Sequence, residues 1–168
     1  LSRSVFLQSN QNGAGEYDFS GLLPEQIQGF GLGVMAARCA YYARQLGLNE
    51  EKLRVYGPHG QGLVCANSCG PDYDAVLSAR LTEQTRTANL RVRELGFKPY
   101  LAPALSSAAV SILRLGQEHF GAVPLGGAYF GCRSRMTPFG VSLIREKIAP
   151  ALLEELQTTH TALEAFEY

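Results

Sequence analysis

The sequence predicts an α+β domain in which an antiparallel sheet is packed by long helices. Residues 118–143 alternate enough to form two or three strands, and strands that follow one another in this way pair antiparallel. Long helical patterns of apolar residues cover residues 31–46, 71–95 and 144–166. With 168 residues and 46% hydrophobic content, the chain can build one domain with a core of its own.

The first third begins with a short apolar strand that runs into polar turn residues over 4–10. The Gly-, Asn-, Asp- and Ser-rich residues 11–21 indicate a loop, and residues 22–32 are ambiguous. A helix follows over 31–46, and Gly47 is its expected stop.

Two strands, 53–56 and 63–67, are expected on either side of a turn that contains Gly57-Pro58-His59-Gly60. A polar amphipathic helix should then cover 71–95. The Ala-, Ser-, Val-, Ile- and Leu-rich residues 103–115 indicate a buried helix.

The strands of residues 118–143 are separated by turns at 126–127 and 137–140. The last element expected is a long amphipathic helix over 144–166. Its apolar-leaning stripe consists of Ile148, Leu152, Leu156, Thr159 and Leu163.

Composition excludes several classes of function. Fifteen basic and fifteen acidic residues cancel, and no basic block is present, so a nucleic-acid partner is not expected. The apolar runs are too short to span a membrane. The four cysteines are scattered and need not pair, which favours free thiols and a cytoplasmic location. Cys65 and Cys69 lack a second ligand pair, so no metal site is expected.

A glycine-rich stretch precedes the first long helix. Gly29, Gly31 and Gly33 suggest a dinucleotide fingerprint, but the third glycine comes one position early and no clear strand leads into it. We therefore do not assign phosphate binding to this stretch.

His59 is the strongest candidate for acid–base chemistry. Flanking glycines leave its ring uncrowded, and an imidazole changes charge near neutral pH. The alternative is a turn histidine that only caps a strand end. His119 and His160 are interpreted as structural.

Arg38 lies on the first long helix among small and aromatic residues, so we expect it to be partly buried. A buried guanidinium seeks a bidentate carboxylate, which either a ligand or the protein itself could supply. Arg133 and Arg135 are expected to be exposed strand or loop charges.

The order of these features resembles the C-terminal catalytic domain of the lactate/malate dehydrogenase superfamily. Each motif is short, and the order and spacing along nearly the whole chain give the resemblance its specificity. The matching segments are Phe6–Gln11 (the family's Asn turn), Val34–Arg38 (its LDxxR helix), Leu53–Gln61 (the strand into GEHGD), Pro103–Leu115 (its buried helix) and Val123–Gly126 (its VPxxG strand).

The resemblance implies an NAD-dependent 2-hydroxyacid dehydrogenase. Arg38 would bind the substrate carboxylate, His59 would exchange a proton with the substrate oxygen, and Asn10 would lie near the nicotinamide and the reacting oxygen. Residues 1–20 would be the last strand and linker of the nucleotide-binding domain, and residues 21–168 the catalytic domain. A homodimer or homotetramer is the expected assembly.

One departure from the family bears on catalysis. The aspartate that orients the family's histidine is replaced here by Met35, and losing such a partner in a serine triad costs on the order of 10⁴ in rate. Asp18, Glu16 or Asp72 could substitute for it.

The chain opens in mid-strand at Leu1 and lacks the family's nucleotide-binding half, which holds most of the NAD site. We therefore expect a piece of a longer protein that is inactive in isolation, and the sequence does not distinguish lactate from malate. Two alternatives stay open: a diverged, non-catalytic relative that binds a small acid or mediates assembly, and an unrelated α+β domain.

Overall fold

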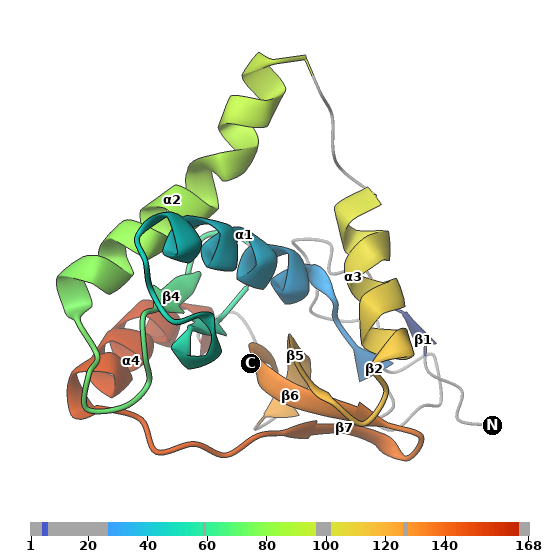
Figure 1. The fold of residues 1–168 in the computed structure, drawn as a ribbon. Helices are drawn as coiled ribbons and strands as arrows, with labels where there is room; N and C mark the ends of the chain where they lie inside the picture. Colours follow the sequence, from blue (N-terminus) through green and yellow to red (C-terminus); the bar gives the residue numbers. More distant parts are fainter. Residues whose placement is uncertain (1–4, 7–26, 59, 97–101, 126–127, 165–168) are drawn as a thin grey trace.

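The structure, a computed structural model, describes residues 5–6, 27–58, 60–96, 102–125 and 128–164. It confirms the α+β class. Figure 1 shows helix α1 in the middle of the molecule, with α2 and α3 on either side of it and the β5–β6–β7 sheet below. Helix α4 lies beyond β4, on the side of the molecule away from α3.

Apart from the start of α4, the helices begin and end close to the predicted positions, with local signals at several ends. The Asp74 side chain accepts the N–H of Leu77 and so caps the start of α2. Gly47, at a φ of 69°, follows the end of α1. The helices are α1 (Gly31–Gln45), the 3₁₀ turn η3 (Glu50–Lys52), α2 (Ala75–Glu94), α3 (Ala102–Leu113) and α4 (Pro150–Glu164).

The strands form three small sheets within the described residues. The predicted antiparallel pairing is confirmed in the two larger ones: β3 (Arg54–Tyr56) pairs with β4 (Val64–Ala66), and β6 (Ala128–Thr137) lies between β5 (Glu118–Leu125) and β7 (Gly140–Leu143). Strands β1 (Val5–Phe6) and β2 (Ile27–Gln28) pair in parallel, which the sequence did not predict.

The core consists of two apolar clusters that meet at β3 and β4. These strands are buried along their whole length, and alternate residues face opposite clusters. One cluster joins Tyr56 and Val64 to β6 and α4. The other joins Val55 and Cys65 to α1 and α2. The turn between β3 and β4 is therefore fixed from several elements at once.

The predicted helix over 144–166 was too long at its start. Helix α4 begins at Pro150, a residue that suits the first helical position because its missing N–H would have no helical partner there. The preceding residues continue from β7 without helical structure, and the Glu146 side chain bonds to Arg54 and Arg133.

The burial predicted for residues 103–115 was also wrong. Helix α3 leaves large apolar side chains in solvent, with 66% of Leu105 and 85% of Leu113 exposed. Among residues 105–113 of this helix, Ser111 is the one buried side chain. The helix packs on α1 through small residues, because a Cβ at Gly33 would lie 2.1 Å from the Ser107 Oγ.

Candidate functional site

Arg38 lies midway along α1, where the sequence predicted a partly buried guanidinium. Its helical neighbours Met35 and Cys39 are in the core, whereas Ala37 is exposed, so Arg38 sits at the boundary of the buried face. Burial lowers the pKa of the Arg38 guanidinium, which nevertheless stays charged at neutral pH. The position favours a bound anion, because a desolvated cation without a counter-charge is costly.

The Arg38 side chain lines a cleft of about 1220 Å³ between α1, α3, the start of β3 and strands β5 and β6. Most of the lining is apolar and aromatic, from residues such as Tyr41 and Val110, and the hydroxyl groups of Ser106, Ser107 and Ser111 lie along α3. The cleft is large enough for a small organic acid, since ligand pockets usually measure about 300–1,000 Å³.

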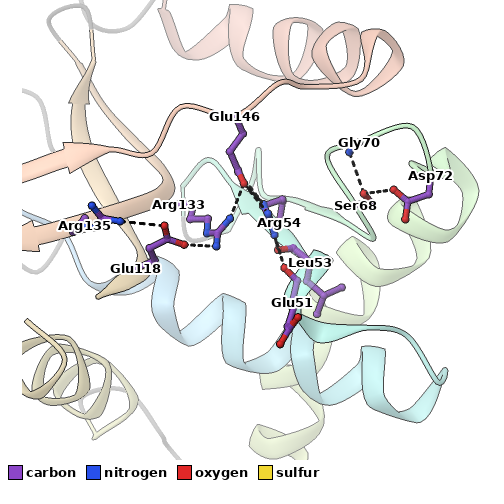
Figure 2. Close-up of polar contacts among 10 residues, drawn as sticks. All are labelled: Glu51, Leu53, Arg54, Ser68, Gly70, Asp72, Glu118, Arg133, Arg135 and Glu146. Atoms are coloured by element: carbon purple, nitrogen blue, oxygen red, sulfur yellow. Dashed lines mark hydrogen bonds and ion pairs between the residues drawn. The ribbon is translucent and has the colours of Figure 1, made fainter. Parts of the chain in front are cut away.

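Two of the other arginines that line this cleft are held by carboxylates. Figure 2 shows the Glu146 carboxylate between Arg54 and Arg133, with Nη2 of Arg54 and Nη1 of Arg133 each 2.7 Å from Oε1. Arg133 also pairs with Glu118, which in turn bonds to Arg135. The network contradicts the expectation that Arg133 is an exposed charge, whereas Arg135 is exposed as predicted.

Electrostatics in this network favours the ionised carboxylate. Burial would raise the pKa of Glu146, but hydrogen bonds from Arg54 and Arg133 and their positive charges outweigh burial and lower it. Burial also opposes the charge on Arg54, and its bonds with Glu146 reverse that effect and raise its pKa. Glu146 is therefore a fixed anion that neutralises one wall of the cleft.

Arg38 and Arg114 differ from these paired arginines. Both line the same cleft, and neither forms an ion pair with any residue in the described part of the chain. Arg38 is the desolvated one of the two, while Arg114 is exposed at the end of α3. The cleft thus contains two guanidinium groups that no described carboxylate pairs with. No local pattern in the sequence identified Arg114, since only the packing of α3 against α1 brings it to the cleft.

His59 and Asn10 lie outside the described residues, so their predicted roles stay predictions. The flanks of His59 are described: Gly57 and Gly62 form the two sides of the β3–β4 turn. None of the described residues from 55 to 64 lines the Arg38 cleft, which reaches β3 only at its start, at Leu53 and Arg54.

The structure describes two of the positions that bear on the carboxylate expected near His59, namely Met35 and Asp72. Met35, at the family's aspartate position, is only 2% exposed and packs with Leu63 and Leu81. The Asp72 carboxylate accepts hydrogen bonds from Lys52 and Ser68, and these bonds lower its pKa to about 2. Asp18 and Glu16 lie outside the described residues.

The other two histidines have different surroundings. His160 is buried on α4 and its Nε2 lies 2.8 Å from the carbonyl oxygen of Gly62, so it contributes to the structure as expected. His119 lines the Arg38 cleft, which sequence reasoning did not foresee. Burial lowers the pKa of His119, and a bond to the Gln117 carbonyl partly opposes this effect.

Two glycines of the glycine-rich stretch before α1 have structural roles. The Gly29 carbonyl accepts the N–H of Ala122, and Gly33 lies against Ser107, so these glycines serve strand pairing and helix packing. Among the described side chains there is no group of three or more His, Cys, Asp or Glu suited to a metal ion. No described helix combines the length and hydropathy needed to cross a membrane.

Solved structures of dehydrogenases share this fold. Malate dehydrogenase from Aeropyrum pernix matches 89% of the chain with a TM-score of 0.68 and 17% identity, and the match covers 58% of that protein. Malate dehydrogenase from Archaeoglobus fulgidus, solved in complex with NADH, matches 88% with a TM-score of 0.69 and 18% identity, over 53% of its length. L-lactate dehydrogenase from Clostridium thermocellum matches 89% with a TM-score of 0.66 and 16% identity, over 57% of its length.

The fold predicted from the family resemblance is therefore confirmed, and the chain spans a little over half the length of these dehydrogenases. Neither the family models nor the curated protein sequences contain a match to this chain. The similarity thus concerns the fold alone.

Proposed function

We propose that the complete protein is an NAD-dependent 2-hydroxyacid dehydrogenase of the lactate/malate type, and that this chain is its catalytic domain. The observation that supports this most is the half-buried Arg38 guanidinium, which lines a cleft and has no carboxylate partner among the described residues. A fixed planar cation of this kind suits a bidentate carboxylate.

In this proposal each side chain has one task. Arg38 binds the carboxylate of a 2-hydroxy or 2-oxo acid and so fixes its second carbon, and His59 exchanges a proton with the oxygen on that carbon. Asn10 lies near the reacting oxygen. As the family resemblance implies, NAD is bound mainly by a nucleotide-binding domain outside this chain, and the isolated chain is inactive.

Assembly and location belong to the same proposal. The exposed apolar side chains of α3, Leu105 and Leu113 among them, are the kind of surface that a homodimer or homotetramer covers. We place the protein in the cytoplasm, where its four cysteines stay reduced; those in the structure are free thiols.

The test is an assay of the complete protein with NADH and a panel of 2-oxo acids. We expect His59→Ala and Arg38→Gln each to lower kcat/KM by at least about a hundredfold while the fold stays intact. Arg80→Gln, at an exposed position of α2, is the matched control. Unchanged turnover in either site variant would refute the role assigned to that residue.

A second candidate function is a diverged relative that binds a small acid without turning it over. The buried Met35 favours this alternative, because α1 then offers no carboxylate to orient an imidazole. Binding of a 2-oxo acid to the complete protein, lost in Arg38→Gln and not accompanied by NADH oxidation, would support it over the enzyme.

A further inference from the structure

The β3–β4 turn is held by a buried histidine from the other end of the chain. The Nε2 of His160, on α4, lies 2.8 Å from the carbonyl oxygen of Gly62. A carbonyl oxygen only accepts hydrogen bonds, so Nε2 must carry the proton and His160 donates. The His160 residue is 8% exposed, and its ring packs edge-on against Phe130 with the centroids 4.9 Å apart.

The opposite side of the turn is held by β6. The N–H of Gly57 donates to the Gly131 carbonyl at 2.8 Å. The backbones are close enough that a Cβ at Gly131 would lie 2.1 Å from the Gly57 oxygen. A Cβ at Gly57 would lie 2.4 Å from the Gly62 oxygen and 2.6 Å from Nε2 of His160. The two sides of the turn and the His160 ring therefore meet in one tightly packed place.

These contacts fix the described residues on the two sides of position 59. Gly57 is bonded to β6 and Gly62 to α4, and within the turn the N–H of Leu63 donates to the Gly60 carbonyl at 3.2 Å. Met35, by contrast, packs in the core and provides α1 with no hydrogen-bond acceptor or charge directed at this turn. The described constraints on the turn thus come from β6 and α4.

We propose that His160 is a positioning residue for the proton-transfer step, acting through its hydrogen bond to Gly62. The proposal rests on the proposed function, in which His59 moves the proton. Catalysis requires the reacting groups to be held within a small range of positions. An anchored turn restricts the backbone on both sides of His59, whereas Met35, at the family's aspartate position, offers no carboxylate to orient the ring. Because Arg38 binds the acid from α1, loss of the anchor should lower kcat and leave KM for the acid unchanged.

The test replaces the donor while keeping the packing. His160→Phe retains a ring against Phe130 but removes the N–H, and His160→Gln keeps an N–H donor at a similar reach. In His160→Phe we expect the amides of Gly57 and Leu63 to exchange hydrogen about tenfold faster, and kcat of the complete protein to fall about tenfold. His160→Gln should keep amide exchange and kcat close to their wild-type values. Thr158→Phe, at an exposed position of the same helix, should change neither.

Three outcomes would overturn the proposal. Equal loss of kcat in His160→Phe and His160→Gln would show that packing, and not the hydrogen bond, is what matters. Unchanged amide exchange in His160→Phe would show that the bond does not anchor the turn. A rise in KM with kcat unchanged would place the effect on acid binding. If His160→Phe does not fold, His160→Leu takes its place.

The amide exchange also separates this proposal from the proposed function, because it needs no turnover. If His59→Ala leaves turnover intact while His160→Phe still accelerates exchange in the turn, the proton-transfer role is refuted for both histidines. The anchoring of the turn by α4 would then stand as a structural finding.

Discussion

The guanidinium of Arg54, at the start of β3, pairs with the carboxylate of Glu146, which lies 92 residues later in the chain. Nε of Arg54 is 2.8 Å from Oε2 and Nη2 is 2.7 Å from Oε1, a bidentate arrangement. Only 8% of Arg54 is exposed, so this pair is largely removed from water. It joins β3 to the segment before α4 (Figure 2). Arg54 is also part of the lining of the Arg38 cleft.

Breaking this pair should destabilise the fold. In Glu146→Gln, Arg133 keeps its pair with Glu118, but the desolvated Arg54 is left without a counter-charge. We expect the free energy of unfolding at pH 7, measured in urea, to fall by about 3 kcal/mol. Glu154→Gln, at an exposed position of α4, should change it by less than about 0.5 kcal/mol. Equal losses in the two variants would contradict this account.

The same pair should make the stability of the fold depend on pH in a defined direction. The pKa of Glu146 is lower in the folded than in the unfolded state, so its stabilising effect is complete above the unfolded value of about 4.3 and is lost as the pH falls through the folded value. The difference in stability between the wild type and Glu146→Gln should therefore shrink below about pH 4.3. A difference that grows with acidity would have the wrong sign.

The β3–β4 turn should tolerate no side chain at Gly57. Its φ of 87° is strained for any other residue, and a Cβ would also collide with the Gly62 oxygen. Gly47 has a similar φ of 69° with nothing within 4 Å of a Cβ, so Gly47→Ala measures the strain alone. We expect urea unfolding to show a loss of about 1 kcal/mol for Gly47→Ala and at least about 3 kcal/mol for Gly57→Ala. Similar losses would mean that the crowding is relieved by local movement.

Much of the fold was predictable because its signals are local. The Gly47 stop and the alternating strands of residues 118–143 are each set by a few neighbouring residues, and the structure confirms them. The start of α4 was missed although Pro150 signals it. The apolar stripe extends back to Ile148, and periodicity alone does not show that Glu146 is drawn to Arg54.

The site was predictable only in part, since its geometry depends on contacts far apart in the sequence. Small and aromatic neighbours indicated that Arg38 is partly buried, and it is. The sequence around Arg114, His119 and His160 does not show which cleft or turn each side chain contacts. Those contacts depend on how α1, α3 and α4 pack in the folded protein. For His59 and Asn10 the sequence remains the basis of the assignment.

Met35 offers a way to test whether an imidazole can approach α1. Met35→Asp places a carboxylate in an apolar cluster, which should cost at least about 3 kcal/mol at pH 7 and raise the pKa of the new group. The variant should then become more stable relative to wild type as acid protonates it. Met35→Leu should cost less than about 1.5 kcal/mol. A small cost for Met35→Asp near pH 6 that disappears in a His59→Ala background would instead show that the two side chains pair.

Arg38 and Arg54 line the same cleft, but their substitution should have different effects on the free energy of unfolding. Arg54→Gln leaves Glu146 short of a partner and should lower the free energy of unfolding by about 3 kcal/mol. Arg38 is desolvated with no ion pair among the described residues, so Arg38→Gln should change stability by less than about 0.5 kcal/mol or increase it. Urea unfolding of both variants checks this contrast. A loss in Arg38→Gln as large as that in Arg54→Gln would mean that a carboxylate of the protein already holds Arg38.

Binding of a ligand at Arg38 should be measurable as a rise in the melting temperature of the protein. A small carboxylate that binds the folded protein raises the unfolding temperature as its concentration exceeds the dissociation constant. Pyruvate and malonate should therefore raise the melting temperature of the complete wild-type protein, and Arg38→Gln should abolish the rise. Chloride at equal ionic strength controls for screening, which acts on both proteins alike. A rise of the same size in Arg38→Gln would place the bound acid away from Arg38 and remove the main support for the dehydrogenase proposal.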